Sequence, residues 1–479
     1  MTDHATDTGI EQHAIDWIPN EERHGKVSSL GAIWWVANIN LTGMSTGVAT
    51  LAVGAGLFWT VVATFVGSLF GTFFMAFHSS QGPQLGLPQL VQSRPQFGYL
   101  GAALTVWVFA LVNYVAYNTS DALLSGAAAQ HLFHVPSSTL GYALAALVAA
   151  VIALYGYRWI HHVEHWLAIP MVVALVILTV AVIANAANTA ELWKPGPFHF
   201  ASVMTVFVIV AGFQLGWAPY VSDYSRYLPA TTGTRSTFWW TYLPSAVSAI
   251  WVFALGSAVA ALAPDEPDPV KAFTAIGDSL APGLGWLVSF LLFVGLLAIM
   301  AINQYGGSLS MISIIDSFRP ARSGRRLRAA TIVAMALIVF VVAQTVGVDR
   351  FNSFYGNALI FLAYLFTPWT AINLVDYFFV RRGAYVIREI FNPRGMYGRW
   401  GWNGIAAYLL STAIMVPFFV TTPFTGFLAH RLGDVDYSMF VGLPVAGLLY
   451  WLFSRRIDLE SERLLVVEEG VLPLHHGSH

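Results

Sequence analysis

Long apolar runs dominate this chain of 479 residues and limit what it can fold into. They recur along the whole chain in segments of roughly 18–28 residues, the length that a helix needs to cross a bilayer. Only 10% of the residues are charged and 57% are hydrophobic, so a water-soluble globule could not cover its own core. We expect an all-α polytopic membrane protein whose few polar groups inside the spans carry the function.

Twelve transmembrane helices are predicted from these runs. Their approximate ranges are 30–54, 57–78, 100–129, 139–157, 165–187, 201–221, 238–262, 284–306, 329–348, 354–379, 403–423 and 437–454. With a cytoplasmic N-terminus, the Lys and Arg residues on the outer side are only Lys194, Lys271, Arg350 and Arg431 of the 23 in the chain, as the positive-inside rule requires. We therefore predict a multi-pass protein of the plasma membrane, the inner membrane in a bacterium, with both termini in the cytoplasm.

Composition excludes several other classes of protein. The formal net charge of −2 gives no basis for binding nucleic acid, and the absence of Cys excludes disulfides and thiolate chemistry. No Walker loop is present for ATP-driven transport. A membrane enzyme would need a nucleophile–base pair or a metal cluster, and the only cluster of this kind is His161, His162 and His165 at a predicted helix end. We predict neither enzyme activity, nor a cofactor or metal, nor an obligatory protein partner.

Two of the predicted spans are interrupted by polar and helix-breaking residues. The first reads IWWVANINLTGMSTGVATLAVGAG (33–56), and its interrupting residues are Asn38, Asn40, Gly43 and Gly47. The sixth reads VFVIVAGFQLGWAPYVSDYSRYLP (206–229), and its interrupting residues are Gly212, Gln214, Gly216 and Pro219. Broken helices at matching places in two inverted halves point to a substrate site at the middle of the membrane. Alternatively, the Gly43 and Gly47 pair lets two helices pack closely.

Five motifs along the chain are similar to those of the nucleobase–cation symport-1 family, the permeases for purines, cytosine and allantoin. They are QGPQLGLPQLVQSRPQFGYLG (81–101), GYRWIHHVEHW (156–166), GWAPYVSDYSRYLP (216–229), NQYGGSLSM (303–311) and PWTAINLVDYFFVRRGAY (368–385). The chain resembles the cytosine/purine branch of that family most. The resemblance implies the LeuT-like fold, in which two inverted five-helix repeats are followed by two further helices. It also implies secondary active transport by alternating access.

The resemblance divides the predicted spans into repeats. Residues 1–29 form a cytoplasmic tail, residues 30–190 hold helices 1–5 of the first repeat, and residues 200–380 hold helices 6–10 of the inverted second repeat. Residues 400–455 hold helices 11 and 12, and residues 456–479 form a second cytoplasmic tail.

A planar heterocycle needs an aromatic face for stacking and in-plane donors and acceptors for its edge. The family places an aromatic residue and an amide one turn apart on the third span, and these positions resemble Tyr114 and Asn118. A shift of one residue would select Asn113 and Tyr117 instead. On the eighth span, NQYGGSLS resembles the family's Asn-x-Tyr-Ser-x-x-Leu-Ser, which puts Asn303 at the position of the substrate-binding amide.

The two interrupted spans add four candidate substrate-binding residues. By resemblance, Gln214 and Trp217 lie where the hydantoin and cytosine branches carry an aromatic residue, so either position could face the substrate. Trp217 could instead pack inside the helix bundle. Asn38 and Asn40 flank the predicted break in the first span, where they either reach the ligand or cap freed backbone groups.

Three charged residues, Asp223, Arg226 and Asp376, lie at the predicted cytoplasmic ends of the sixth and tenth spans. We expect inner-gate ion pairs from them. The alternative is that they anchor the helix ends at the membrane interface.

The coupling ion is predicted from the eighth span. In sodium-coupled relatives, hydroxyls five and six residues before the substrate-binding amide help to hold Na⁺, and here those positions are Ala298 and Leu297. A hard cation prefers oxygen ligands, so H⁺ is favoured over Na⁺. The only acid well inside a span is Asp121 on the third helix, which makes it the candidate for proton coupling. Alternatively, Asp121 reaches the outer interface.

We therefore predict a secondary active transporter that imports a nucleobase, cytosine or a purine, by proton symport. The alternative within the same class is a permease for allantoin, uracil, a hydantoin or a vitamin-like heterocycle, with Na⁺ as the coupling ion. A passive channel is the alternative from a different class, and it would not accumulate substrate against a gradient.

Overall fold

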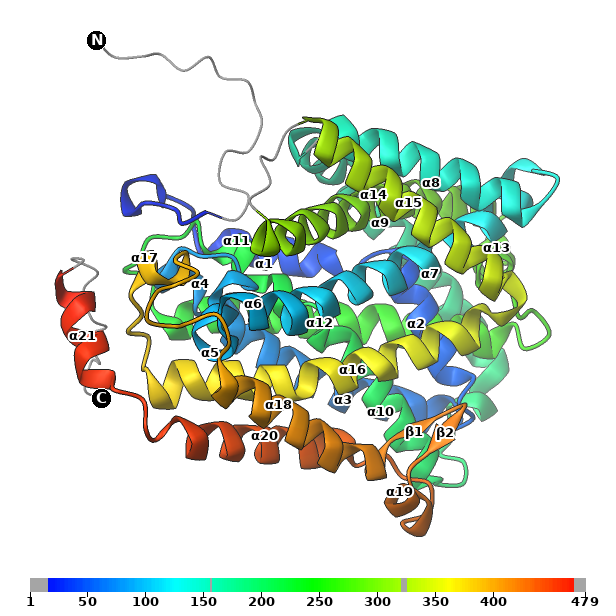
Figure 1. The fold of residues 1–479 in the computed structure, drawn as a ribbon. Coiled ribbons are helices and arrows are strands. Elements are labelled where there is room, and N and C mark those ends of the chain that lie inside the picture. The colour runs from blue at the N-terminus through cyan, green and yellow to red at the C-terminus, as the bar shows by residue number, and fades with distance from the viewer. Residues whose placement is uncertain (1–15, 156, 320–324, 469–479) are drawn as a thin grey trace.

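The structure, a computed structural model, describes residues 16–155, 157–319 and 325–468 (Figure 1). Helices of different lengths lie side by side in one bundle and run in roughly the same direction (Figure 1). The first described residues, the short helices α4 and α17 and the C-terminal helix α21 lie at one end of this bundle, on the left of the view. The other end carries α13, α19 and a short β-hairpin. Both ends of the described chain therefore lie on the same side, as an even number of crossings requires.

The first half of the chain folds into helices that match the predicted spans closely. They are η1 (Asn20–Glu22), α1 (Ser28–Ala37), α2 (Leu41–Leu51), α3 (Leu57–Ser79), α4 (Gly82–Leu85), η2 (Val91–Ser93), α5 (Arg94–Phe97), α6 (Tyr99–Ala102), η3 (Ala103–Trp107), α7 (Val108–Phe133), α8 (Ser138–Tyr155), α9 (Tyr157–Ala186) and η4 (Ala187–Trp193).

The second half continues the same pattern and ends in a short helix outside the bundle. Its elements are α10 (Phe200–Leu215), η5 (Ala218–Tyr220), α11 (Val221–Ser225), α12 (Thr234–Leu262), α13 (Pro269–Asp278), α14 (Leu284–Phe318), α15 (Arg325–Val346), η6 (Val348–Arg350), α16 (Phe351–Val375), η7 (Asp376–Val380), α17 (Ile387–Ile390), α18 (Trp402–Met415), η8 (Val416–Phe418), β1 (Val420–Thr421), β2 (Phe424–Thr425), α19 (Phe427–Arg431), α20 (Ser438–Ser454) and α21 (Leu459–Glu468).

Eight helices in the described part of the chain are long and apolar enough to cross a membrane, or nine if α20 and α21, bent by 87°, count as one span. Three shorter apolar helices coincide with the first, fourth and eleventh predicted spans. Every predicted range thus falls on a helix, while the total of twelve crossings stays a prediction. Several boundaries are wrong. The span predicted for 403–423 ends earlier, because β1 pairs with β2 from residue 420. The span predicted for 284–306 continues as α14 to Phe318, and the span predicted for 165–187 belongs to α9, which begins at Tyr157.

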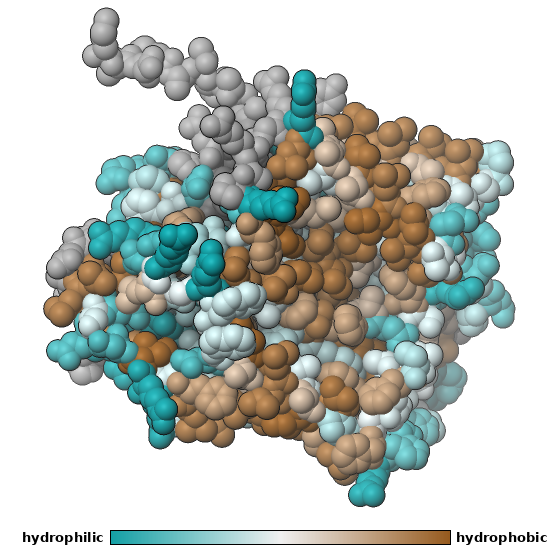
Figure 2. Space-filling model, in the orientation of Figure 1, coloured by the Kyte–Doolittle hydropathy of each residue, from teal (hydrophilic) through white to brown (hydrophobic). Residues whose placement is uncertain are grey.

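The bundle exposes apolar side chains over much of its surface. Figure 2 shows a broad hydrophobic area across the middle of the visible face, with hydrophilic residues gathered at the two ends of the bundle. Ile169, Ile183 and Val341 are among the exposed residues, at 73%, 66% and 59% of their surface. Soluble monomers rarely expose large contiguous apolar patches, so this surface is suited to face lipid.

The predicted break in the first span is confirmed. α1 ends at Ala37 and α2 begins at Leu41, and Asn40 between them has an extended backbone with φ −156° and ψ 172°. The Asn40 side chain caps both halves, because its Oδ1 accepts from the Gly43 N–H at 2.7 Å and its Nδ2 donates to the Ala37 carbonyl at 2.9 Å. This amide satisfies backbone groups that the break removes from the helix ladder.

The predicted break in the sixth span is also confirmed. α10 ends at Leu215, and the chain continues through Gly216 and Trp217 into the short helices η5 and α11. Pro219 lies in η5, where its missing N–H interrupts no regular helix ladder.

Gly43 and Gly47 lie inside α2 and do not form the break. A Cβ on Gly47 would lie 2.1 Å from the Phe253 carbonyl oxygen of α12, and one on Gly256 of α12 would lie 2.0 Å from the Met44 carbonyl oxygen. The close-packing interpretation is therefore correct for Gly47, which lets α2 and α12 touch along their backbones. It does not hold in this form for Gly43, because a Cβ there would lie 2.3 Å from the Asn38 carbonyl oxygen, next to the break.

We expect Gly47→Ala to destabilise the protein, because the added methyl group forces α2 away from α12. Overpacking of this kind costs about 1–3 kcal/mol. Thermal unfolding of the purified protein measures the effect. Gly356→Ala is the matched control, since its Cβ meets only Ile209 Cδ1 at 3.9 Å. An equal loss of stability in both variants would contradict the packing role of Gly47.

We expect Asn40→Ala to lower the free energy of unfolding by about 0.5–2 kcal/mol, the usual cost of losing a helix N-cap. Asn40→Ser keeps an oxygen that can accept a backbone N–H at the start of α2, without adding a buried charge, and should lose less stability than the alanine variant. Thermal unfolding of the two variants checks this order, and a more stable alanine variant would refute it.

Candidate functional site

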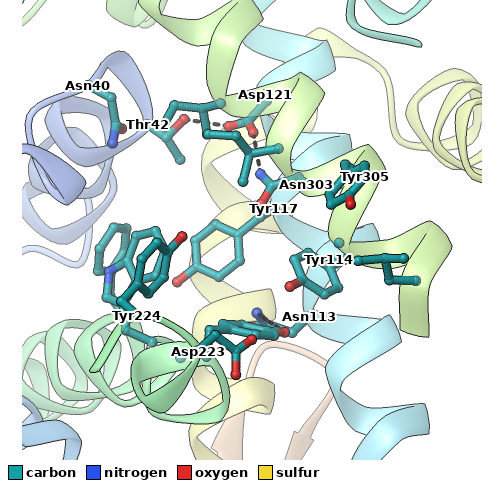
Figure 3. Close-up of a pocket in the computed structure, with 18 of the residues that line it drawn as sticks. Asn40, Thr42, Asn113, Tyr114, Tyr117, Asp121, Asp223, Tyr224, Asn303 and Tyr305 are labelled. Atoms are coloured by element: carbon teal, nitrogen blue, oxygen red, sulfur yellow. Dashed lines mark hydrogen bonds between the residues drawn. The ribbon is translucent and has the colours of Figure 1, made fainter. Parts of the chain in front are cut away.

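A cavity of about 140 Å³ lies where the two broken helices meet α7 and α14 (Figure 3). An engineered protein cavity of about 150 Å³ holds benzene, so this volume suits a small planar ring. The lining residues are Asn40, Thr42, Asn113, Tyr114, Tyr117, Asp121, Phe213, Gly216, Trp217, Tyr220, Asp223, Tyr224, Arg226, Ile299, Ile302, Asn303, Tyr305, Gly306 and Leu309. The first and sixth spans contribute through their breaks, as the sequence predicted.

Aromatic rings form much of the wall. The rings of Tyr114 and Tyr220 lie 4.7 Å apart, and Tyr117 packs edge-on against Phe213 with ring centres 5.6 Å apart. Trp217, from the break in the sixth span, lies 6.4 Å from Phe213. These rings offer faces and edges on which a flat heterocycle can stack.

Of the two acids that line the cavity, Asp121 and Asp223, the first lies beside the predicted substrate-binding amide. Asp121 is fully buried in the middle of α7, so it does not reach the outer interface. Its Oδ1 accepts from the Thr42 hydroxyl at 2.5 Å, and its Oδ2 accepts from Asn303 Nδ2 at 3.1 Å (Figure 3). Asp121 therefore connects Thr42, near the start of α2, to Asn303, the predicted substrate-binding amide.

Two further polar atoms in the wall are buried and have no hydrogen-bond partner among the described residues. They are the side-chain oxygen of Asn113 and the indole nitrogen Nε1 of Trp217. The Asn113 amino group is already committed, since it donates to the Tyr220 hydroxyl at 3.0 Å. Buried polar groups in proteins are nearly always satisfied, so these atoms mark positions where a ligand or water would bind.

The predicted substrate-binding residues divide into two groups. Asn303, Trp217, Tyr114 and Asn40 line the cavity, although the Asn40 amide is occupied by capping. On α7, the one-residue shift is partly right, because Asn113 and Tyr117 also line the cavity.

The other three predicted amides are not among the lining residues. Gln214 donates to the Thr72 hydroxyl of α3 at 2.6 Å, and Asn118 points at the Met300 carbonyl of α14. Asn38 donates to the Ser245 carbonyl of α12 at 3.0 Å. These amides hold neighbouring helices together, because a buried amide in the bundle must find a partner on one helix or another.

The three predicted gate residues do not form one group. Asp223 and Arg226 line the cavity, and Asp223 Oδ1 accepts from the Gln89 backbone N–H at 2.8 Å. Asp376 lies outside the cavity and forms a short ion pair with Arg381. An ion pair between Asp376 and Arg226 is therefore not part of this structure, and the actual cationic partner of Asp376 was not singled out in the sequence.

The Asp376 ion pair belongs to a buried cluster that includes the C-terminal helix. Arg381 Nε donates to both carboxylate oxygens of Glu462 in α21, at 3.0 and 3.1 Å, and the Tyr397 hydroxyl donates to the same carboxylate at 2.6 Å. Burial raises the pKa of Glu462, and the neighbouring Arg381 guanidinium opposes this increase. Residues 456–479, predicted as a tail, thus include a helix that is attached to the bundle.

Several lining residues were not anticipated from the sequence. Thr42, Phe213, Tyr220 and Tyr224 look like ordinary residues of a helix interior, and only the position of Tyr220 and Tyr224 inside GWAPYVSDYSRYLP gave a signal. Within the described residues, no group of three His, Cys, Asp or Glu side chains could hold a metal. The side chains of His161, His162 and His165 lie outside the described part.

Comparisons with known proteins agree with this architecture. Residues 17–442 match the family described as permeases for cytosine/purines, uracil, thiamine and allantoin. The chain is 35% identical over 453 residues to YxlA of Bacillus subtilis (strain 168), named as a purine-cytosine permease, covering 93% of this chain and 96% of that protein. It is 27% identical over 404 residues to the purine-cytosine permease fcyB of Emericella nidulans, covering 81% of this chain and 78% of that protein.

Solved structures support the fold. Mhp1, a nucleobase-cation-symport-1 family transporter, in a closed conformation with bromovinylhydantoin bound, superposes with a TM-score of 0.75 at 17% identity. The match covers 97% of this chain and 100% of Mhp1, which confirms the predicted LeuT-like helical fold. The chain is therefore a multi-pass membrane transporter and not an enzyme, and it belongs to the nucleobase–cation symport-1 family of permeases.

Proposed function

We propose that this protein imports cytosine or a purine base by proton symport, through alternating access to the cavity between the broken helices. The names of its relatives support a nucleobase as substrate. The observation that carries the proposal is the cavity itself, in which aromatic rings, an amide and one buried acid converge on a space the size of a single ring.

The wall of the cavity suits a nucleobase. Tyr114, Tyr220 and Trp217 offer aromatic surfaces, while Asn303, Asn113 and the Trp217 indole offer polar atoms for the edge of a ring. A base with both donors and acceptors around its plane uses such a set fully. A purely apolar ligand would leave these buried groups unsatisfied, which costs free energy.

Asp121 supports the choice of H⁺ as the coupling ion. Burying an acid inside a membrane span costs free energy, so such residues are rare and usually have a function. Asp121 is buried and lines the cavity. Its described hydrogen-bond partners, Thr42 and Asn303, are neutral, so no fixed positive charge holds it ionised. Positions 297 and 298 of α14 carry Leu and Ala, which supply no side-chain oxygen for Na⁺.

Alternating access would use the two breaks as hinges. Two lining residues, Asp223 in α11 and Arg226 directly after it, mark one end of the cavity. Asp223 accepts a hydrogen bond from Gln89 in the connection after α4. We assign this side to the cytoplasm, because the Arg-rich connections and both ends of the described chain lie there, as the positive-inside rule predicts.

Uptake by cells that lack their own base permeases tests the proposal. We expect labelled cytosine, adenine or hypoxanthine to accumulate, a protonophore to abolish accumulation, and replacement of Na⁺ by choline to have no effect. Uptake of allantoin or uracil alone would assign another substrate within the family. Uptake that only equilibrates across the membrane would identify a passive channel.

We expect Asp121→Asn to bind the base but to lose accumulation driven by a pH gradient, because the amide cannot carry a proton. Proteoliposomes with an imposed pH gradient, and a binding assay on the same purified protein, measure the two effects separately. Accumulation at the unsubstituted level in this variant would exclude Asp121 as the proton carrier.

A further inference from the structure

Two amides in the wall of the cavity each donate an amino hydrogen to another group of the protein. Asn303 donates to Asp121 Oδ2 at 3.1 Å, and Asn113 donates to the Tyr220 hydroxyl at 3.0 Å. What remains for a bound base is the carbonyl oxygen and the second N–H of each amide, and the oxygen of Asn113 is buried without a described partner. In the described state the two amides therefore present hydrogen-bond acceptors to the cavity.

The orientation of the Asn303 amide follows from the charge of Asp121. An ionised carboxylate can only accept hydrogen bonds, and the Thr42 hydroxyl already donates to Oδ1. The second oxygen must then receive the amino group of Asn303, as it does in the structure. A protonated Asp121 that carries its hydrogen on Oδ2, the oxygen beside Asn303, would donate it to the carbonyl oxygen of Asn303.

We propose that Asp121 is the positioning residue for Asn303, and that its ionisation decides whether Asn303 presents an acceptor or a donor to the bound base. Protonation would turn the terminal amide by half a turn about its Cβ–Cγ bond and exchange the two atoms that face the cavity. This inference rests on the proposed function, because it deepens the account of the same site.

The surroundings of Asp121 leave it as the group that changes charge. Two phenols, Tyr117 of α7 and Tyr355 of α16, interact electrostatically with its carboxyl. A phenol is neutral near neutral pH. From α2 and α14 the contacts are the Thr42 hydroxyl and the Asn303 amide, while Asp223 of α11 and Arg226, which directly follows α11, line the same cavity. Asn113 is paired with a phenol, so the same titration does not turn it.

The switch would link substrate and proton without a separate ion site. A base that offers a carbonyl oxygen or an unprotonated ring nitrogen to Asn303 binds better when Asp121 is protonated. By thermodynamic reciprocity, the bound base raises the proton affinity of Asp121. A base that offers an amino group at this position favours the ionised form. The edge that a substrate turns to Asn303 would thus decide whether it carries a proton.

The test compares matched bases that differ by an amino-to-oxo exchange, cytosine with uracil and adenine with hypoxanthine. Competition against labelled cytosine on the purified full-length protein gives the affinity ratio within each pair. In Asp121→Asn, the new side-chain amino group donates to the Asn303 carbonyl and fixes the turned amide. We expect both ratios to move toward the oxo base by about tenfold, the effect of exchanging one hydrogen bond.

Ser125→Ala is the matched control on the same helix, since Ser125 points at the Met300 sulfur and is not among the lining residues. Its ratios should equal those of the unsubstituted protein. Acidification of the unsubstituted protein should move the affinity ratios toward the oxo base, as Asp121→Asn does. If the variant does not fold, the measurements across this pH series test the switch on their own. Unchanged ratios in Asp121→Asn, or across the pH series, would overturn the switch. If the unsubstituted protein binds none of the four bases, the proposed function itself fails.

Discussion

The core of a bilayer contains no water to hydrogen-bond a free backbone group, so each break in a membrane helix must be satisfied by the protein itself. The rest of this structure depends on that constraint. Asn40 satisfies the first break by capping α2 and bonding the last carbonyl of α1. Asn40 itself and Thr42, the second residue of α2, lie in the cavity wall.

Buried charge is handled in two different ways at two places in the bundle. Asp376 and Glu462 share the guanidinium of Arg381 and several phenol hydroxyls, an arrangement that offsets the desolvation cost of each charge. Asp121 has only a hydroxyl and an amide among its described partners. The first arrangement suits a fixed structural contact, which joins the C-terminal helix to the bundle. The second suits a group that gains and loses a proton.

Much of the site could be predicted from the chain because the chemistry is sparse. A bundle made of Leu, Val, Ala and Phe makes each interior acid conspicuous, and this led directly to Asp121, while the family resemblance led to Asn303 and Trp217. The same argument could not separate Gln214, Asn118 and Asn38 from the true lining residues. A buried amide looks the same in sequence whether it faces a cavity or bonds the next helix, and rotation by one residue, about 100° on a helix, decides between them.

The sequence by itself determined the membrane-spanning helices, the two broken spans and the family, because hydrophobic length and the local chemistry of Asn, Gly and Pro are properties of short segments. It also determined that residues 297 and 298 provide no side-chain oxygen for a sodium ion. Only the tertiary structure decided that Gly47 serves packing, that Arg381 pairs with Asp376, and that Asp121 holds the amide of Asn303. Those contacts join residues from different helices, and their partners are fixed by how the helices rotate and pack against one another.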